Sequence, residues 1–437
     1  CLALNPSGSN LASATDNNIN LANAVCREIR KKHPDKGVIT YAYAVTAQPP
    51  QRIMPISGVR ITYCYYSDGQ PTRMPWSSRA GRAIMRWSEL TGGNILLYSY
   101  SYLNPRYVFN SEQVYTAMFR FFQAQGIQGS LQECAETWGG VDPYMMYLGG
   151  RLAWNAWVDE AVLKNDYFAK LYGAAAVPMR RFHDLLAADL VDRTRWKRHG
   201  ITSFPCIPAA DLSKMTADIA IARQSVAADA RALAAVNVQE KYLGFLKAYS
   251  LALDTGECYY QQPTEARYQT ANAALKSLRE LTVELAKERV VSALLSRLYD
   301  GWQRNMDAKY RENVALQKVR RDHDVLTLLE NWRFQPDPQV CGEKEKWFAA
   351  AYDDSRWTTI KSGEFWEEQG FPDYNGAAWY RTTLELPGGT AFSLYFGGID
   401  ERAWVYLDGQ YIGGHHEGDS AKLWNEAFQV ALPPGLK

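Results

Sequence analysis

The chain has 437 residues, of which 48 are basic and 47 acidic, so its formal net charge is +1. This balance excludes recruitment of nucleic acid or of an anionic membrane by a global electrostatic field. The sequence also lacks the run of about eighteen apolar residues that a transmembrane helix needs. The length predicts roughly two or three domains. Aromatic residues make up 13% of the chain, which favours large packed cores first and sugar-stacking surfaces second.

The seven cysteines indicate neither a metal site nor a disulfide framework, because they are scattered and include no C-x-x-C pair. No cofactor and no metal are therefore expected. The sequence has no initiator Met and no signal-peptide pattern at its start. Cys1 is compatible with the lipid-bearing first residue of a mature lipoprotein. We favour the simpler interpretation that the sequence begins partway through a longer protein.

The first part of the chain alternates between helical patterns and β-rich runs, as parallel βα units do. Helices are predicted near 17–33, 77–91 and 111–125 and from about residue 145, and strands at 38–45, 58–66, 94–103 and 129–134. Four such units make the C-terminal half of a (β/α)₈ TIM-type barrel, which we assign to residues 1–200, with a long helical closure over 145–200. The alternative is a complete small doubly wound sheet. It is less favoured because no glycine-rich phosphate loop follows any strand.

The residue composition and the hydrophobic pattern change twice after this α/β region. Residues 201–335 are predicted to form an all-α bundle, because 211–325 is rich in Ala, Leu, Glu, Lys and Arg. Residues 340–437 are predicted to form an all-β sandwich from short runs at 378–387, 391–398, 402–415 and 427–433. Asp408 and Gly409 lie between two strand-like runs and predict a type I′ hairpin. The sequence stops where a last strand is expected, so we predict a truncated sandwich.

The candidate site follows from the barrel, because barrel pockets lie at the carboxyl ends of the strands. Those ends carry a set of tyrosines, Tyr63, Tyr65 and Tyr100, and one carboxylate, Glu133. Rings that stack on sugars and hydroxyls that bond to them suit a carbohydrate pocket. Since side chains alternate along a strand, Glu133 is expected to share a face with Leu131 and to point into the barrel mouth. An exposed loop acid is the alternative for Glu133, and barrel packing is the alternative for the tyrosines.

Further candidates lie in the loop after this strand and near the end of the chain. Glu136 and Trp138 are included as substrate-binding candidates, although an exposed loop acid and a core-capping indole are the simpler interpretations. His415 and His416 have no carboxylate or Cys partner at a metal-binding spacing. A solvated hairpin end is the favoured interpretation of that pair.

Three stretches resemble a known family: "LANAVCREIRKKHPDKGVITYAYAVTAQPP", "GIQGSLQECAETWGG" and "YMMYLGGRLAWNAWVDEAVLKNDYFAKLYGAAAVPMRRF". They are similar to a bacterial family long catalogued only as a domain of unknown function. Its members are distantly similar to α-glucuronidases, and some are classed as endo-β-N-acetylglucosaminidases acting on N-glycans. The resemblance covers about residues 1–190 and implies the C-terminal half of that family's barrel. The matched pattern consists of Leu152, Ala153, Trp154, Asn155, Asp159, Tyr172, Gly173, Ala174, Ala175, Pro178 and Met179.

The resemblance also implies a role for Glu133. In the family, a glycine-led strand ends in a glutamate ahead of a "W-G" loop; the glutamate falls on Glu133, and Trp138 and Gly139 match the loop. Cys134 stands where the pattern has glycine. The resemblance implies that Glu133 is the acid/base, or that it orients an N-acetyl substituent if the reaction is substrate-assisted.

A second resemblance covers the end of the chain. Residues 346–437 contain "WFAAAYDDSRWTTI", "AAWYRTTLELP" and "LYFGGIDERAWVYLDGQYIGGH". They resemble the galactose-binding-like jelly roll of β-galactosidase and β-glucuronidase enzymes. That domain is usually an accessory, so the resemblance does not by itself imply a sugar site.

These observations predict a secreted or periplasmic bacterial glycoside hydrolase acting on complex glycans, with N-acetylhexosaminide linkages as one class. Its partner is a carbohydrate rather than a nucleic acid. The competing class is a non-catalytic carbohydrate-binding protein whose barrel has lost its acid. A second carboxylate at another strand end separates the two, and we expect it upstream of Cys1. Because four strands are predicted and closure needs about eight, this chain alone is expected to be inactive.

Overall fold

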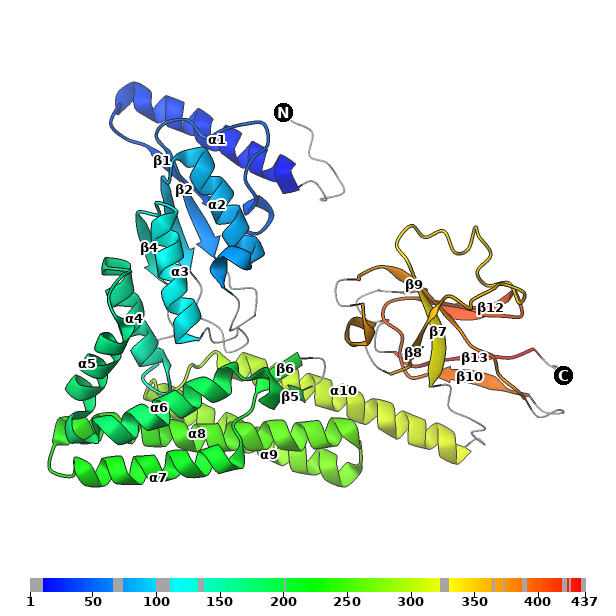
Figure 1. Cartoon of the computed structure of the whole chain (residues 1–437). Coiled ribbons are helices and arrows are strands. Elements are labelled where there is room, and N and C mark those ends of the chain that lie inside the picture. Colours follow the sequence, from blue (N-terminus) through cyan, green and yellow to red (C-terminus); the bar gives the residue numbers. More distant parts are fainter. Residues whose placement is uncertain are drawn as a thin grey trace. The chain divides into compact units, whose positions relative to one another are not determined.

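The structure is a computed structural model, and its parts are described one by one (Figure 1). It describes residues 11–65, 74–99, 111–132, 137–199, 202–322, 330–363, 366–371, 374–386, 391–418, 423 and 426–433. The chain divides into two compact units, Cys1–Met306 and Asp307–Lys437. The predicted boundary near residue 200 lies inside the first unit and stays a prediction. Within the ranges given, no helix has both the length and the apolar character to cross a membrane.

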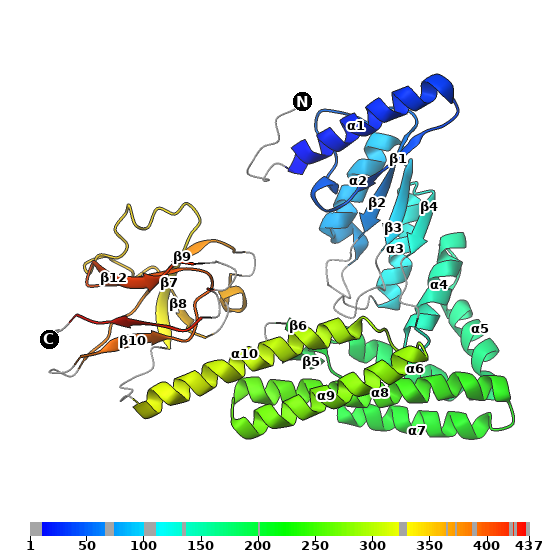
Figure 2. The same ribbon diagram turned by 180° about the vertical axis from the view of Figure 1, so that it is seen from behind.

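The first unit begins with a four-stranded parallel sheet, whose strands follow one another in chain order (Figures 1 and 2). The strands are β1 (Val38–Ala42), β2 (Val59–Tyr65), β3 (Ile95–Ser99) and β4 (Gly129–Gln132). The helices are α1 (Leu11–Lys32), α2 (Arg79–Thr91) and α3 (Glu112–Ala124). All four predicted strands and the three helices are confirmed. The order β1-β2-β3-β4 contains no reversal, whereas a doubly wound sheet needs one. Closure into a barrel stays a prediction.

The two faces of this sheet differ in burial. Partners in a parallel register share a face, so Ala42, Tyr63 and Leu97 lie together, and these three are 1%, 2% and 1% exposed. We call this the helix-covered face, because its Tyr65 packs edge-on against Phe122 of α3 at 5.3 Å. On the second face, the apolar side chains at both sheet edges are largely exposed: Ile39 is 55%, Tyr41 54% and Leu131 59% exposed.

Helix α1 holds the connection between β1 and β2 with polar side chains. Asp16 Oδ1 accepts hydrogen bonds from the backbone N–H groups of Gln51, Arg52 and Ile53 at 3.0–3.1 Å. Asn23 donates to the carbonyl of Met54 at 2.8 Å and accepts from the N–H of Ile56 at 3.0 Å. The connection contains only the short 3-10 helix η1 (Ala44–Thr46), and α1 satisfies several backbone groups of the rest.

Residues 145–200 are not one long helical closure, which corrects the prediction for this segment. The α-helices here are α4 (Asp142–Trp154), α5 (Glu160–Tyr172) and α6 (Ala176–Val191), and the short 3-10 helices are η3 (Gly173–Ala175) and η4 (Arg193–Arg195). They are followed by β5 (Trp196–His199), which pairs antiparallel with β6 (Thr202–Pro205). Helix α5 begins after Asp159, whose side chain caps it by accepting hydrogen bonds from the N–H groups of Ala161 and Val162. Gly173, at a φ of +51°, ends α5.

The helical region predicted over 211–325 is confirmed as four helices. They are α7 (Ala209–Ser225), α8 (Ala230–Gln261), α9 (Glu265–Lys287) and α10 (Leu295–Asp322). Helices α5 and α6 pack onto α8 and α7 respectively, and an ion pair joins Arg181 of α6 to Asp218 of α7. The bundle therefore includes helices that the sequence patterns assigned to the barrel.

The second unit contains the predicted β-rich region as three small antiparallel sheets. Its strands are β7 (Asn331–Asp337), β8 (Thr358–Lys361), β9 (Ala377–Arg381), β10 (Ser393–Phe396), β11 (Ala403–Leu407), β12 (Gln410–His415) and β13 (Phe428–Ala431). Strand β7 is central in the order β8-β7-β9 and precedes the predicted start at residue 340. The sequence patterns did not predict this strand, because Pro336 and Pro338 lie in or next to it and proline is rare in central strands. The predicted hairpin is confirmed: Asp408 and Gly409 have φ values of +48° and +87°.

Candidate functional site

The candidate site lies at the edge of the sheet where the parallel strands end. The last described residues of the strands there are Ala42, Tyr65, Ser99 and Gln132. Helix α3 follows β3 and helix α4 follows β4, so both helices start on the side of the sheet at which the strands end. In βα folds this edge is where chemistry collects, because the loops after the strands are free to vary.

The predicted site residues separate into three groups. Tyr100, Glu133 and Glu136 lie outside the described residues. Tyr63 and Tyr65 lie on the helix-covered face and are 2% and 5% exposed. Burial raises the pKa of Tyr63 to about 12. The Tyr65 ring packs against Phe122 of α3, and both rings are too buried to offer a surface to a sugar, which corrects their predicted place in the barrel mouth. Leu131 lies on the second face, opposite to them.

The structure describes Trp138, and both its backbone N–H and its carbonyl form hydrogen bonds with the helical bundle. Its N–H donates to the carbonyl of Arg289 at 2.7 Å, and its carbonyl accepts from Gln239 Nε2 at 2.9 Å. Gln239 Oε1 also accepts from the N–H of Gly140 at 2.8 Å. We call this pair of bonds the Gln239 clamp. The Trp138 side chain is 54% exposed, so a solvated indole stands on a rigidly held backbone.

The two glycines of the loop permit this close packing. A Cβ built on Gly139 would lie 2.5 Å from Cδ2 of Tyr242 and 2.5 Å from the carbonyl oxygen of Val290. Gly140 has a φ of +73°, which favours glycine, and a Cβ there would lie 2.6 Å from Tyr242 Cζ. Glycine is therefore required at both positions by the contact between the loop and the bundle.

Asp142, the first residue of α4, is a site carboxyl that the sequence analysis missed. Burial raises its pKa to about 6, although Thr137 Oγ1 donates a hydrogen bond at 2.9 Å that opposes the rise. A carboxyl with a pKa near 6 exchanges protons under mild conditions, as acid–base groups do. An acid in the first turn of a helix is common, so its position gave no distinguishing signal.

We predict that Asp142 makes the unfolding free energy fall between about pH 4 and pH 6. Its folded pKa lies above the unfolded value, so the unfolded chain loses the proton first and is favoured as pH rises through this window. Asp142→Asn should remove this contribution, on the order of 2–3 kcal/mol. Urea unfolding at pH 4 and pH 7 measures it. The exposed Asp35→Asn is the control, and equal pH dependence in wild type and Asp142→Asn would contradict the prediction.

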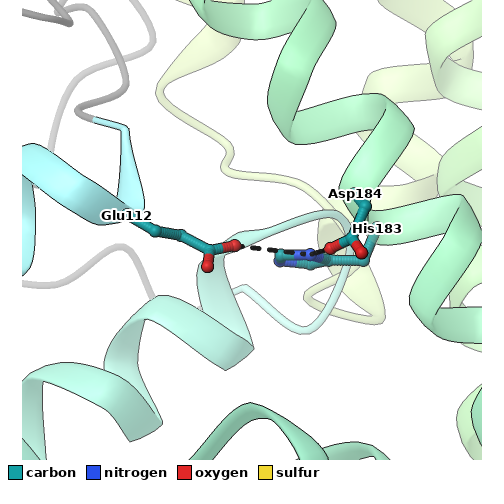
Figure 3. A group of neighbouring side chains, drawn as sticks. All are labelled: Glu112, His183 and Asp184. Carbon is teal, nitrogen blue, oxygen red and sulfur yellow. Dashed lines mark hydrogen bonds and ion pairs between the residues drawn. The ribbon is translucent and has the colours of Figure 1, made fainter. Parts of the chain in front are cut away.

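A second polar cluster near this site joins side chains from α3, α4, α5 and α6. Figure 3 shows three of its members, Glu112, His183 and Asp184. His183 Nδ1 of α6 lies 3.4 Å from Asp184 Oδ1 and 3.8 Å from Glu112 Oε1 of α3. Lys164 of α5 places its Nζ 2.7 Å from Glu112 Oε1 and 2.5 Å from Asp184 Oδ1. The ring of Tyr144, from α4, meets the His183 ring edge-on at 4.9 Å.

A cation already lies between the two carboxylates of this cluster. Glu112, His183 and Asp184 each offer one ligand atom, and these atoms lie within 4.8 Å of one another, as metal ligands do. However, the ammonium group of Lys164 contacts both carboxylates and lies where a metal ion would have to bind. Burial would raise the pKa of Asp184, but hydrogen bonds from His183 and Lys164 lower it to about 2. We interpret the cluster as a structural ion-pair network.

A small cavity separates the Gln239 clamp from this network. It is lined by Gly140, Tyr144, Tyr167, Phe168, Tyr172, Met179, Phe182, His183 and Gln239. Its volume of about 10 Å³ has room for roughly one water molecule. A sugar ring does not fit into this cavity.

Comparison with known proteins finds a family model that matches the first part of the chain. Residues 1–184 match the model of a family described as "Domain of unknown function (DUF4838)". No curated protein matches the chain. A solved structure of a "GH138 enzyme targeting pectin rhamnogalacturonan II" is 10% identical, with a TM-score of 0.36. The match covers 69% of this chain, and the chain spans 65% of that structure. At this TM-score the likeness establishes neither the fold nor the activity.

The DUF4838-matching region contains α1, the whole parallel sheet and helices α2 to α5, with the match ending inside α6 at Asp184. It therefore includes Trp138, Asp142 and the Glu112–His183–Asp184 cluster. Gln239 and Arg289 lie beyond it, in the bundle. The candidate site is thus built from residues inside and outside the matched region.

Proposed function

We propose that this chain is part of a glycan-active, glycoside-hydrolase-like protein whose substrate binds at the edge where the β1–β4 strands end. The observation that carries the proposal is the exposed indole of Trp138 on a backbone held by Gln239 and Arg289. An aromatic ring that is already held in place stacks on a pyranose with little further loss of entropy. Asp142 supplies a titratable carboxyl in the same loop region.

Glu133 is the proposed catalytic carboxylate of this site. The proposal is based on its place at the end of the fourth strand and on the resemblance of "GSLQECAETWGG" to a strand that carries a site glutamate. Tyr100 and Glu136 remain proposed substrate contacts on sequence grounds alone. Action on N-acetylhexosaminide linkages belongs to the same proposal, as do a complete (β/α)₈ barrel, the galactose-binding-like identity of the second unit and a secreted or periplasmic location.

The test is digestion of a glycan panel, with products read by mass spectrometry. The panel contains N-glycans, pectic polysaccharides and neutral hemicelluloses, and it is run on this chain and on any longer natural form. We expect the longer form to cleave at least one glycan and this chain alone to cleave none. In the active form, Trp138→Ala should raise KM about tenfold because a stacking contact is lost. The control is Trp154→Ala, since Trp154 is 93% exposed and is the last residue of α4. Binding without cleavage supports the non-catalytic alternative. The proposal is overturned if the protein neither binds nor cleaves any glycan of the panel.

A further inference from the structure

Three aromatic side chains gather on the β11–β12 hairpin of the second unit: Trp404, Tyr411 and His416. The rings of Trp404 and His416 are stacked, with centroids 5.2 Å apart and planes at 9°. The Tyr411 hydroxyl lies 2.9 Å from His416 Nε2. Trp404 is 54% exposed and Tyr411 is 50% exposed. We call these three residues the Trp404 platform.

The strand register explains how the hairpin builds this platform. Trp404 is paired with Gly414, and Ala403 with His415, so Trp404 and Gly414 share one face of the hairpin. His416 follows two residues after Gly414 and returns to that face. His415 points the other way, where its ring stacks on Phe428 at 4.8 Å and 9°. The adjacent histidines thus serve different faces, and only His416 belongs to the platform.

Gly414 leaves the space in which the platform forms. A Cβ built on Gly414 would lie 2.2 Å from the carbonyl oxygen of Ala403 and 3.0 Å from Cδ2 of His416. Without that atom, the His416 ring lies flat against one face of Trp404. The hydrogen bond between Tyr411 and His416 fixes the ring from its edge. The indole is therefore held in one orientation before any ligand arrives.

We propose that the Trp404 platform is a carbohydrate-binding site, in which the indole stacks on the apolar face of a pyranose ring. The Tyr411–His416 pair at its rim supplies polar atoms for sugar hydroxyls. Preorganised rings suit this ligand, because binding then orders few further side chains. The site does not depend on the activity proposed for the Trp138 loop.

The size of the platform decides between a saccharide and a protein partner. A stable protein interface buries about 800 Å² on each side. Aromatic side chains contribute about 150–250 Å² each when fully buried, and the platform has three rings of which the two largest are half exposed. Its available area is therefore well below that of a protein interface. It matches one or two sugar rings.

The test is affinity electrophoresis of the whole chain in native gels containing galactan, xylan, mixed-linkage β-glucan or homogalacturonan. We expect retardation by at least one of these polymers relative to a polymer-free gel. Trp404→Ala should weaken binding roughly tenfold, and Trp404→Phe should weaken it less, because a phenyl ring still stacks. His416→Ala should also weaken binding, since the indole loses its support. The matched control, Trp154→Ala, should bind as wild type does, and thermal unfolding midpoints confirm that the variants are folded.

Two outcomes overturn the inference: no retardation in any of the four gels, or retardation of Trp404→Ala equal to that of the wild type. Its failure is distinguishable from that of the proposed hydrolase function. Cleavage of a short soluble oligosaccharide reports on the Trp138 site, and we expect Trp404→Ala to leave it unchanged. Retention on a polymer reports on the platform.

Discussion

Replacing Glu133 by Gln is expected to lower glycan turnover about a hundredfold or more, with KM little changed. The amide keeps the shape of the side chain but removes the proton that a general acid or base must transfer, and such transfer contributes about 10²–10⁴ to the rate. A loss confined to kcat indicates an interaction made in the transition state. The measurement is steady-state hydrolysis of the best glycan found in the panel, by the longest form that is active.

Two further variants make this result specific. Glu89→Gln applies the same chemical change to an exposed position of α2 and should leave turnover as it is. Glu136→Gln should act on KM, because Glu136 is proposed as a substrate contact. If Glu133→Gln keeps near-wild-type turnover while remaining folded, Glu133 is an exposed loop acid. The site then needs another catalytic carboxyl, and Asp142 is the candidate among the residues that the structure describes.

The local sequence patterns predicted the elements of the parallel sheet but not the direction of its tyrosines. The run "GVRITYCYY" alternates Val59, Ile61, Tyr63 and Tyr65 with Arg60, Thr62 and Cys64, so it separates two faces without indicating which of them meets the helices. The register shows that Tyr63 and Tyr65 lie with Ile61 on the helix-covered face. Their hydroxyl groups suggested a sugar pocket, but the two side chains are buried on the face that packs against helices.

The contacts that build the site could not be predicted, because their partners are far apart in the sequence. Gln239 bonds to Trp138 and Gly140 across 101 and 99 residues. In the sequence it is one polar residue in an amphipathic helix, where a solvated face is the expected interpretation. The same holds for Lys164, whose partner Glu112 lies 52 residues away. Long-range polar pairing of this kind is decided by the tertiary packing of the helices.

Lys164 carries the second prediction, a large loss of stability. Lys164 is 11% exposed and bonds to Glu112 of α3 and Asp184 of α6. Lys164→Met keeps most of the side-chain volume but removes the ammonium group from both carboxylates, and Asp184 then keeps Arg180, whose Nε lies 3.6 Å from Asp184 Oδ2. Breaking a buried pair costs about 3–5 kcal/mol. Because Asp184 is 45% exposed and remains partly hydrated, we expect a decrease of about 2–3 kcal/mol in the unfolding free energy. Urea denaturation at pH 7 measures it.

The control lies on the same helix. Lys170 is 75% exposed and pairs with Asp166, so Lys170→Met should change the unfolding free energy by no more than about 0.5 kcal/mol. An equal effect of the two substitutions would contradict the buried-network interpretation.

Acid provides an independent test of the same network. Hydrogen bonds from His183 and Lys164 lower the pKa of Asp184 to about 2, below its usual value of 3.8, despite the opposing effect of burial. Its contribution to stability is therefore fully present above about pH 4 and is lost as the pH falls toward 2. Lys164→Met removes one cause of the low pKa, so stability measured from pH 5 down to pH 2 should fall less steeply in this variant. If the slopes are the same, Lys164 does not hold the Asp184 charge in the folded protein.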